Sequence, residues 1–304
     1  HEFNFMQGEC LYIDKKVSLS NLLATAPAFL FFFFEKEDLK KLEEAIHQPQ
    51  GMVLITGPTG SGKTTTIYSA LAELNTADRN ILSVEDPIEY NVDGINQVQV
   101  NTEIGFDFPL ALRAFLRQDP EIIMVGEIRD LETASIAYKA ASTGHMVVST
   151  LHTNDTASTV TRLVDMGVPT YIVAEATTLV VSQRLMKTIC MKCIDDHQVD
   201  KKNLLEIGVV ESELHLYSQL KRGRGCSRCN GTGLWGREAV FEVMEITAKV
   251  KEAIFSGKTP IEVKRYAMQY NKMRSLRQNA LLKLSRGVTT VEQVISSTLG
   301  DPIG

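Results

Sequence analysis

The sequence contains no apolar stretch long enough to cross a lipid bilayer. The nearest candidate, residues 22–34, is too short for a spanning helix and contains Thr25 and Pro27. It also has no basic start and no small-residue cleavage site, so we do not expect a secretory signal there. The sequence therefore predicts no membrane-spanning segment.

A strong charge imbalance and an internal repeat are also absent. The 304 residues include 32 Lys and Arg against 37 Asp and Glu, which gives a net charge of −5 and a pI near 5.8. This balance gives no electrostatic reason to expect a nucleic-acid partner. With 44% hydrophobic residues, the composition is that of an ordinary globular protein, long enough for one large domain or two smaller ones.

A phosphate-binding loop is the most informative pattern present. Residues 57–64 read Gly-Pro-Thr-Gly-Ser-Gly-Lys-Thr and match the Walker A spacing in full. Glycines let the backbone N–H groups turn toward phosphate oxygens, Lys63 can reach the β- and γ-phosphates, and the Thr64 hydroxyl can hold Mg²⁺. The predicted nucleotide-binding residues are Gly57, Pro58, Thr59, Gly60, Ser61, Gly62, Lys63, Thr64 and Thr65.

Short apolar runs that alternate with helical patterns predict an α/β fold. The strands are expected at residues 52–56, 81–84, 122–125 and 146–150, and the helices at residues 34–46, 64–74, 109–118, 130–142 and 156–165. Continuous apolar strands between helices are typical of a parallel sheet that is covered on both faces. In such sheets the ligand lies at the carboxyl ends of the strands.

Acidic residues follow the second and third predicted strands. Glu85, Asp86 and Glu89 form a cluster after the second strand, and Glu127 ends the third. Several carboxylates beside a triphosphate require a metal between them, so the cluster predicts Mg²⁺. We expect Glu127 to orient the attacking water and to reach Mg²⁺ through its waters. The alternative for Glu127 is a solvated acid at a strand end, and the alternative for the cluster is helix or turn capping by Asp86.

Basic residues supply the remaining catalytic candidates. His152 follows the fourth predicted strand, where it could detect the γ-phosphate and report it to the next segment. Arg113, Arg117 and Arg129 are candidate partners for the phosphate charge. For a lone histidine a structural role is the alternative, and for each arginine a structural salt bridge is equally open.

Four of the five cysteines form two C-x2-C pairs. The pairs are Cys190 with Cys193 and Cys226 with Cys229, and residues 194–225 lie between them. Two such pairs can supply four thiolates in a closed tetrahedron, which predicts a structural Zn²⁺ site. A protein that uses ATP is expected in a reducing compartment, so disulfides are disfavoured. Four reduced, buried thiols are the alternative.

Together these motifs resemble the secretion ATPases of the type II secretion and type IV pilus class. The matching stretches are residues 57–66, 84–90, 112–120, 124–130, 143–145 and 149–154, with the four-cysteine insert. The resemblance covers roughly residues 35–304. It implies a RecA-like parallel sheet, an acidic box at Glu85, Asp86 and Glu89, an atypical Walker B glutamate at Glu127 and a histidine box at His152.

The resemblance also implies an organisation into four parts. These are a remnant of a truncated N-terminal domain (residues 1–34), a RecA-like ATPase core (35–186), a four-cysteine zinc subdomain (187–240) and a C-terminal helical region (241–304). Helical patterns in the last part lie at residues 248–255, 261–270, 275–286 and 291–299.

The activity that the resemblance implies is Mg²⁺-dependent ATP hydrolysis by a ring-shaped hexamer. Such a motor would lie in the cytoplasm at the inner face of the bacterial inner membrane, held there by a membrane platform protein, with no nucleic-acid partner expected. The zinc insert is similar to that of assembly or export motors, so a pilus assembly ATPase is the first hypothesis and a type II secretion ATPase the second. A nucleic-acid motor that uses the basic zinc knuckle and a regulatory nucleotide-binding module without turnover remain as alternatives.

Overall fold

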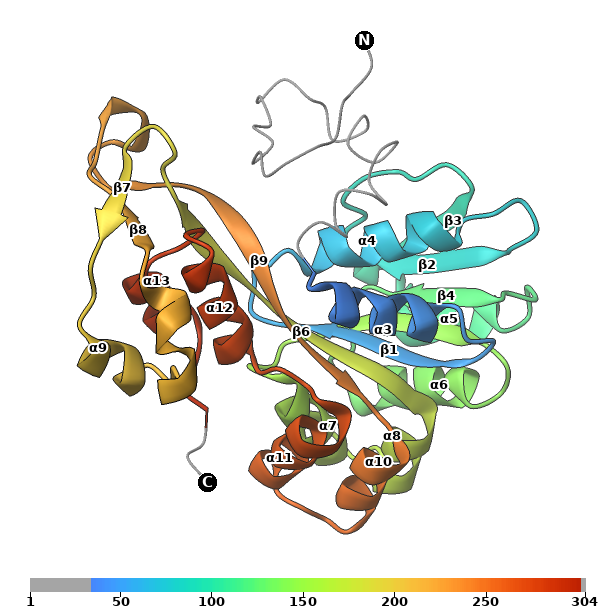
Figure 1. The fold of residues 1–304 in the computed structure, drawn as a ribbon. Helices are drawn as coiled ribbons and strands as arrows, with labels where there is room; N and C mark the ends of the chain where they lie inside the picture. Colours follow the sequence, from blue (N-terminus) through green and yellow to red (C-terminus); the bar gives the residue numbers. More distant parts are fainter. Residues whose placement is uncertain (1–33, 302–304) are drawn as a thin grey trace.

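The computed structural model describes residues 34–301 as a twisted seven-stranded sheet with helices on both faces and a smaller unit at one end (Figure 1). The predicted N-terminal remnant, residues 1–34, lies outside the described residues except for Phe34. None of the helices in the described part of the chain is both long and apolar enough to cross a bilayer.

The large sheet has the strand order β3-β2-β4-β5-β1-β6-β9. Neighbouring strands from β3 to β6 run parallel, whereas β9 is antiparallel to β6. The strands are β1 (Gly51–Thr56), β2 (Ile81–Glu85), β3 (Ile95–Gln99), β4 (Ile122–Val125), β5 (Met146–Leu151), β6 (Thr177–Ile189) and β9 (Leu234–Glu245).

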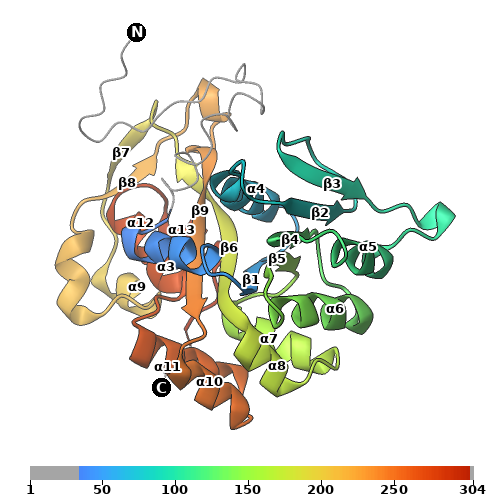
Figure 2. The same cartoon turned by 90° about the vertical axis from the view of Figure 1, so that its right-hand side faces the viewer.

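Helices cover both faces of the sheet, since alternate residues of each buried strand point to opposite sides (Figure 2). Met52 and Leu54 of β1 belong to the core on one face, and Val53 and Ile55 to the core on the other. The first face carries α5 (Phe108–Phe115), α6 (Leu131–Ala141), α7 (Thr156–Asp165), α8 (Thr170–Ala176), α10 (Ala248–Phe255) and α11 (Pro260–Asn271). The second carries α3 (Lys36–Ile46) and α4 (Lys63–Leu74).

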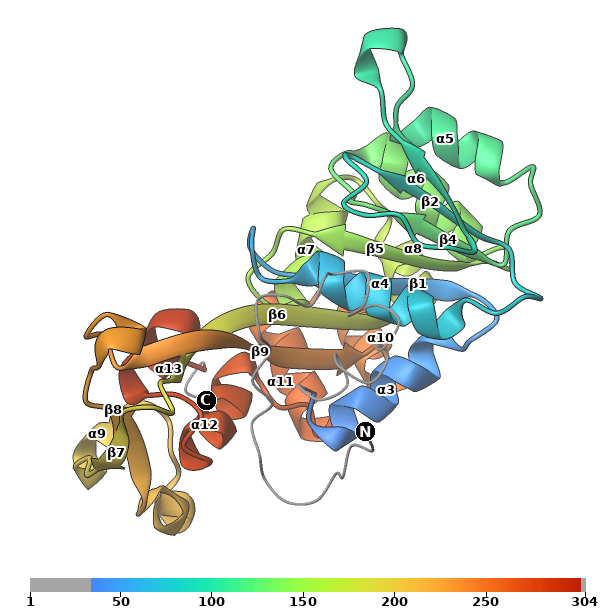
Figure 3. The same ribbon diagram turned by 90° about the horizontal axis from the view of Figure 1, so that it is seen from above.

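The long strands β6 and β9 continue beyond the sheet as a two-stranded ribbon that carries the smaller unit (Figure 3). This unit has its own apolar core, which includes Met186, Tyr217 and Leu281. Its elements are β7 (Ile194–His197), α9 (Lys201–Glu206), η2 (Glu211–Tyr217), β8 (Leu220–Gly223), η3 (Ser227–Cys229), α12 (Leu276–Ser285) and α13 (Val291–Ser297).

The predicted strands and most predicted helices are found within one or two residues of their expected ends. The chain also contains β3, α8, β6 and β9, which the sequence patterns did not predict. The parallel sheet is found as predicted, with β9 added at one edge as an antiparallel strand. Its antiparallel direction arises because the chain returns from the small unit along β6 without a crossover helix on the sheet.

The predicted domain limits after residues 186 and 240 both fall inside continuous strands, β6 and β9. The ATPase core and the zinc subdomain therefore share an uninterrupted ribbon. The division into four parts stays a prediction.

Candidate functional site

The phosphate loop connects β1 to α4 in the conformation that its glycines allow. Gly57, Gly60 and Gly62 have φ values of 142°, 77° and 89°, a region that favours glycine. Gly62 is the N-cap of α4, so the amino end of this helix opens toward the loop. A helix N-terminus with free N–H groups favours anions, and the loop therefore has the shape and polarity for phosphate.

Lys63 lies folded over the loop. Its Nζ donates to the carbonyl oxygens of Gly57 at 2.9 Å and Pro58 at 3.1 Å. Burial lowers the pKa of Lys63, while the negative charge of Glu127 opposes this shift. Within the described residues, the buried Ser61 Oγ has no hydrogen-bond partner, and a phosphate oxygen would supply one. The loop residues thus fit a nucleotide.

A charged cluster forms where three strands end. Glu127, after β4, is paired by Arg129, and its other oxygen lies 3.6 Å from His152 Nε2, after β5. Arg129 also lies 3.8 Å from Asp86, after β2. The pKa of Arg129 is raised by its hydrogen bond to Glu127. Carboxylate oxygens are the ligands that Mg²⁺ prefers, so the cluster fits a metal–nucleotide complex.

Glu85 has a different environment from its neighbour Asp86. Its carboxylate is 3% exposed and accepts from Tyr68, from Ser83 at 2.7 Å and from Gln97 at 3.1 Å. Burial and the adjacent carboxylate raise the pKa of Tyr68, which keeps the phenol protonated as a donor. Both oxygens of Glu85 are thus bonded inside the fold, an arrangement that differs from the prediction of a metal-binding role. The Glu85 carboxylate links β2 to α4, which carries Tyr68, and to β3, which carries Gln97.

The remaining predicted residues lie apart from this cluster. Arg113 on α5 is paired with Glu132 on α6, as in the structural alternative for this residue. Glu89 and Arg117 are exposed, and no polar contact ties either of them to the loop within the described residues.

Gln183 on β6 is a site residue that the sequence patterns missed. Its side chain is 2% exposed, and its Oε1 accepts a hydrogen bond from Thr66 of α4 at 2.6 Å. A Cβ added at Gly57 would lie 2.4 Å from the Gln183 carbonyl oxygen, so the loop and β6 are in close contact. The available signal was an apolar run, residues 179–181, that ends in polar residues like the other strands of the site.

The four predicted zinc ligands lie together at the far end of the β6–β9 ribbon. The Sγ atoms of Cys190, Cys193, Cys226 and Cys229 are all within 4.8 Å of one another. Burial raises the pKa of the Cys229 thiol, but N–H groups of Cys226 and Gly233 point at its sulfur and lower the pKa to about 6. Four thiols at this spacing could bind zinc in a closed site.

The basic run beside the cysteines is largely engaged by the protein itself. Lys221 pairs with Asp196, Arg224 lies 3.5 Å from Asp195, and Arg228 lies over the Trp235 ring at 5.1 Å. Asp195 and Asp196 reduce the net positive charge that this region could offer to a nucleic acid.

Comparison with known proteins gives a consistent result. Residues 23–296 match the family model described as type II/IV secretion system protein. Over 269 residues the chain is 47% identical to the type IV pilus assembly ATPase PilB of Myxococcus xanthus, covering 88% of this chain and 47% of the relative. Over 260 residues it is 44% identical to type II secretion system protein E of Aeromonas hydrophila, covering 86% of this chain and 51% of the relative.

The chain is also similar to a solved structure of the pilus retraction motor PilT with bound ADP, with a TM-score of 0.63 and 29% identity. The similarity covers 84% of this chain and 63% of the PilT chain. The chain spans about half the length of the two curated relatives described above.

Proposed function

The chain belongs to the type II/IV secretion system protein family, and we propose that it is an ATP-hydrolysing motor that powers assembly of a type IV pilus. The observation that carries the proposal is the meeting of Glu127, Arg129 and His152 at the strand ends that adjoin the Lys63 loop. A loop alone could bind nucleotide without turnover, whereas an acid held by Arg129 and facing His152 can also act on water.

Binding is assigned to the loop and to the start of α4. The backbone N–H groups of residues 59–65 donate to the phosphate oxygens, and Lys63 exchanges its two carbonyl contacts for the β- and γ-phosphates. Because Lys63 is already held inside the loop, little side-chain freedom remains to be lost when nucleotide binds.

Hydrolysis is assigned to Glu127. Its carboxylate accepts a proton from the attacking water or orients that water in line with the γ-phosphate. Arg129 holds one oxygen of Glu127, and His152 faces the other. His152 is thereby placed to respond when the γ-phosphate is lost and to shift the β5–α7 turn.

Mg²⁺ would be held by the Thr64 hydroxyl and the Asp86 carboxylate, and it would supply charge neutralisation at the phosphates. Zinc would be held by Cys190, Cys193, Cys226 and Cys229, whose closed arrangement leaves no position for catalysis.

The wider assembly is also part of the proposal. We expect a homo-hexamer in the cytoplasm, attached to the inner face of the inner membrane through a platform protein. A type II secretion ATPase is the second candidate, favoured by the 44% identity to a secretion relative, against 47% for the pilus relative.

The test has two stages. Purified protein is assayed for ATP hydrolysis with Mg²⁺, alone and with added DNA or RNA. Turnover that nucleic acid does not stimulate supports the motor, whereas strong stimulation would favour a nucleic-acid motor. Inactivation of the gene in its own host then separates loss of surface pili from loss of secreted proteins.

A further inference from the structure

We propose that Arg184 and Glu242 are positioning residues that hold the turn carrying His152 against Glu127 and connect it to the C-terminal helices. The inference rests on the proposed ATP hydrolysis, because it gives two further residues a part in that reaction. The turn, residues 152–155, leads from β5 into α7. Neither positioning residue lies in any of the motifs considered above.

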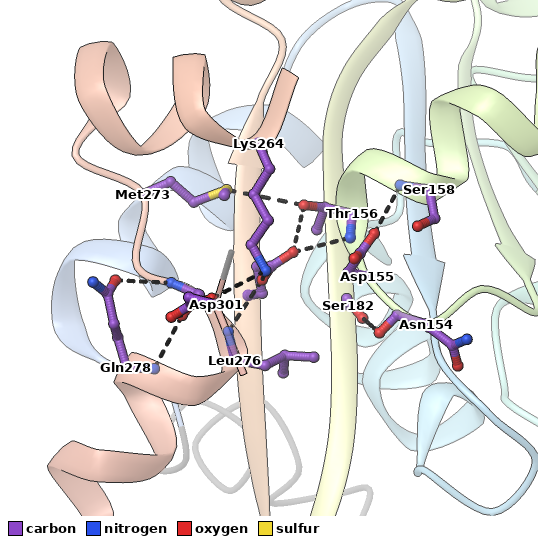
Figure 4. A network of polar contacts seen from close by, with 12 residues as sticks. Asn154, Asp155, Thr156, Ser158, Ser182, Lys264, Met273, Leu276, Gln278 and Asp301 are labelled. Atoms are coloured by element: carbon purple, nitrogen blue, oxygen red, sulfur yellow. Dashed lines mark hydrogen bonds and ion pairs between the residues drawn. The ribbon is translucent and has the colours of Figure 1, made fainter. Parts of the chain in front are cut away.

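Arg184 holds the turn from β6. Its Nη2 donates to the Asn154 side-chain oxygen at 2.9 Å and to the Asn154 carbonyl oxygen at 3.3 Å. Ser182, two residues earlier on β6, lies with its hydroxyl 3.5 Å from the same carbonyl (Figure 4). A guanidinium carries its donors in a rigid fork, so two contacts to one residue define where that residue lies. Asn154 is two residues from His152.

Glu242 holds the other side of the turn from β9. It is fully buried and lies opposite Ser182 in the β6–β9 pair. Its Oε1 accepts from the Thr156 N–H at 3.0 Å and from the Thr156 hydroxyl at 2.7 Å. Asp155, which lies between Asn154 and Thr156, caps α7 by accepting from the Ser158 N–H at 2.8 Å. The turn is therefore fixed at Asn154 by one strand and at Thr156 by the next.

The second oxygen of Glu242 faces the C-terminal helices. It accepts from the N–H of Leu276, the first residue of α12, at 3.1 Å, and it pairs with Lys264 of α11 at 3.0 Å. Burial would lower the pKa of Lys264, but the attraction of Glu242 opposes this and the pKa is raised, so Lys264 keeps its charge in this buried contact. One carboxylate thus joins α7, α11 and α12, and a shift of the turn is transmitted to the unit that carries the cysteines.

The place of the His152 ring depends on this support. Among the described residues the only polar partner of the ring is Glu127, at 3.6 Å, and half of the His152 side chain is exposed. With half of the side chain exposed and no closer polar contact among the described residues, the ring depends on the backbone of the turn for its distance from Glu127. A misplacement of about 1 Å at a reacting centre can lower a rate by about 10²-fold.

Two arginine variants separate positioning from a general loss of charge. Arg184→Met keeps the side-chain length and removes both contacts to Asn154. The matched control is Arg237→Met, which alters an exposed cation on β9 away from the turn. We expect Arg184→Met to lower kcat by roughly 10- to 100-fold with KM for ATP unchanged, because it leaves the phosphate loop intact, and Arg237→Met to match the wild type. Equal kcat in the two variants would overturn the proposal.

A double variant tests whether the effect passes through His152. If it does, Arg184→Met combined with His152→Ala is no slower than His152→Ala alone. Losses that multiply would contradict the assignment.

Thr156→Val removes one donor from Glu242 while leaving the carboxylate paired, and we expect a lower kcat that Thr156→Ser restores. Equal rates for Val and Ser at this position would remove Glu242 from the arrangement.

Amide hydrogen exchange in nucleotide-free protein gives a readout that needs no turnover. Residues 153–158 should exchange faster in Arg184→Met than in the wild type and in Arg237→Met. Unchanged exchange would refute the positioning role. A wild-type protein that does not hydrolyse ATP would refute the proposed function instead, and the exchange result would still decide the inference.

Discussion

The hydroxyl of Thr66 donates to the side-chain oxygen of Gln183 at 2.6 Å and so joins the helix behind the phosphate loop to strand β6. The same side chain lies against Gly62, where an added Cβ would be 2.9 Å from Gln183 Nε2. Strand β6 ends at Ile189, next to Cys190, the first of the four clustered cysteines. One strand therefore touches the phosphate loop and leads to the cysteine cluster.

Loss of the Thr66–Gln183 bond should weaken nucleotide binding. Thr66→Val and Gln183→Leu each remove one partner at nearly constant volume, so the loop loses a support but no cavity forms. Because both variants break the same hydrogen bond, the nucleotide affinity of the double variant should be no lower than that of the single variant that binds nucleotide less tightly. Titration with a fluorescent nucleotide measures this, with Thr178→Val on the distant part of β6 as the control. Additive losses of affinity would show that the two residues act separately.

Lys63 and Glu127 should separate binding from turnover. Lys63→Ala removes a group that contacts phosphate in the ground state, so nucleotide binding should be lost. Glu127→Gln keeps the shape and removes the base, so ATP should still bind while hydrolysis falls by about 10²- to 10⁴-fold. A binding titration beside an ATPase assay measures both effects.

Lys139→Ala on the exposed side of α6 serves as the control for loss of a lysine charge. Normal turnover by the Glu127→Gln protein would remove Glu127 from the mechanism.

Zinc should be structural and present at one ion per chain. Structural zinc sites in small peptides contribute on the order of 10–16 kcal/mol of binding free energy, so loss of the ion should unfold the end of the ribbon. The phosphate loop lies on a separate core and should still bind nucleotide. Elemental analysis of the wild type and of each Cys→Ser variant measures occupancy, and nucleotide titration measures the loop. Full zinc occupancy in the Cys→Ser variants would contradict the assignment.

Asp38→Asn should stabilise the protein, and more so at higher pH. Asp38 on α3 is 3% exposed and receives a contact from Asn279 at 3.4 Å. Burial raises the pKa of Asp38 above 3.8, so its contribution to stability is full below that pH and is lost as the pH rises through the folded-state pKa. The new amide stays neutral and can donate to Asn279 Oδ1, which is buried without a partner among the described residues.

The gain in melting temperature over the wild type should therefore grow as the pH rises from 3.8 toward neutral. Asp93→Asn, an exposed change of the same kind, should show no such trend. A gain that is constant with pH would mean that the charge of Asp38 has no part in it.

The sequence by itself determined the features whose cause is local. The phosphate loop, the parallel strands and the helices that begin after Asp107, Asp130 and Asp155 depend on residues within a few positions of one another. The cysteine spacing predicted a four-thiol cluster, because each pair is formed by one turn of the chain. The meeting of Glu127 with His152 also followed, since the carboxyl ends of parallel strands share one edge.

Only the tertiary structure decided which way the remaining polar side chains face. Glu85 and Asp86 are neighbours in sequence, yet one is enclosed by Tyr68 while the other reaches Arg129. Thr66 and Gln183 are 117 positions apart, and Thr156 and Glu242 are 86 apart. A hydrogen bond depends on direction and distance to within a fraction of an ångström, and a residue pattern carries neither for groups that the fold alone brings together.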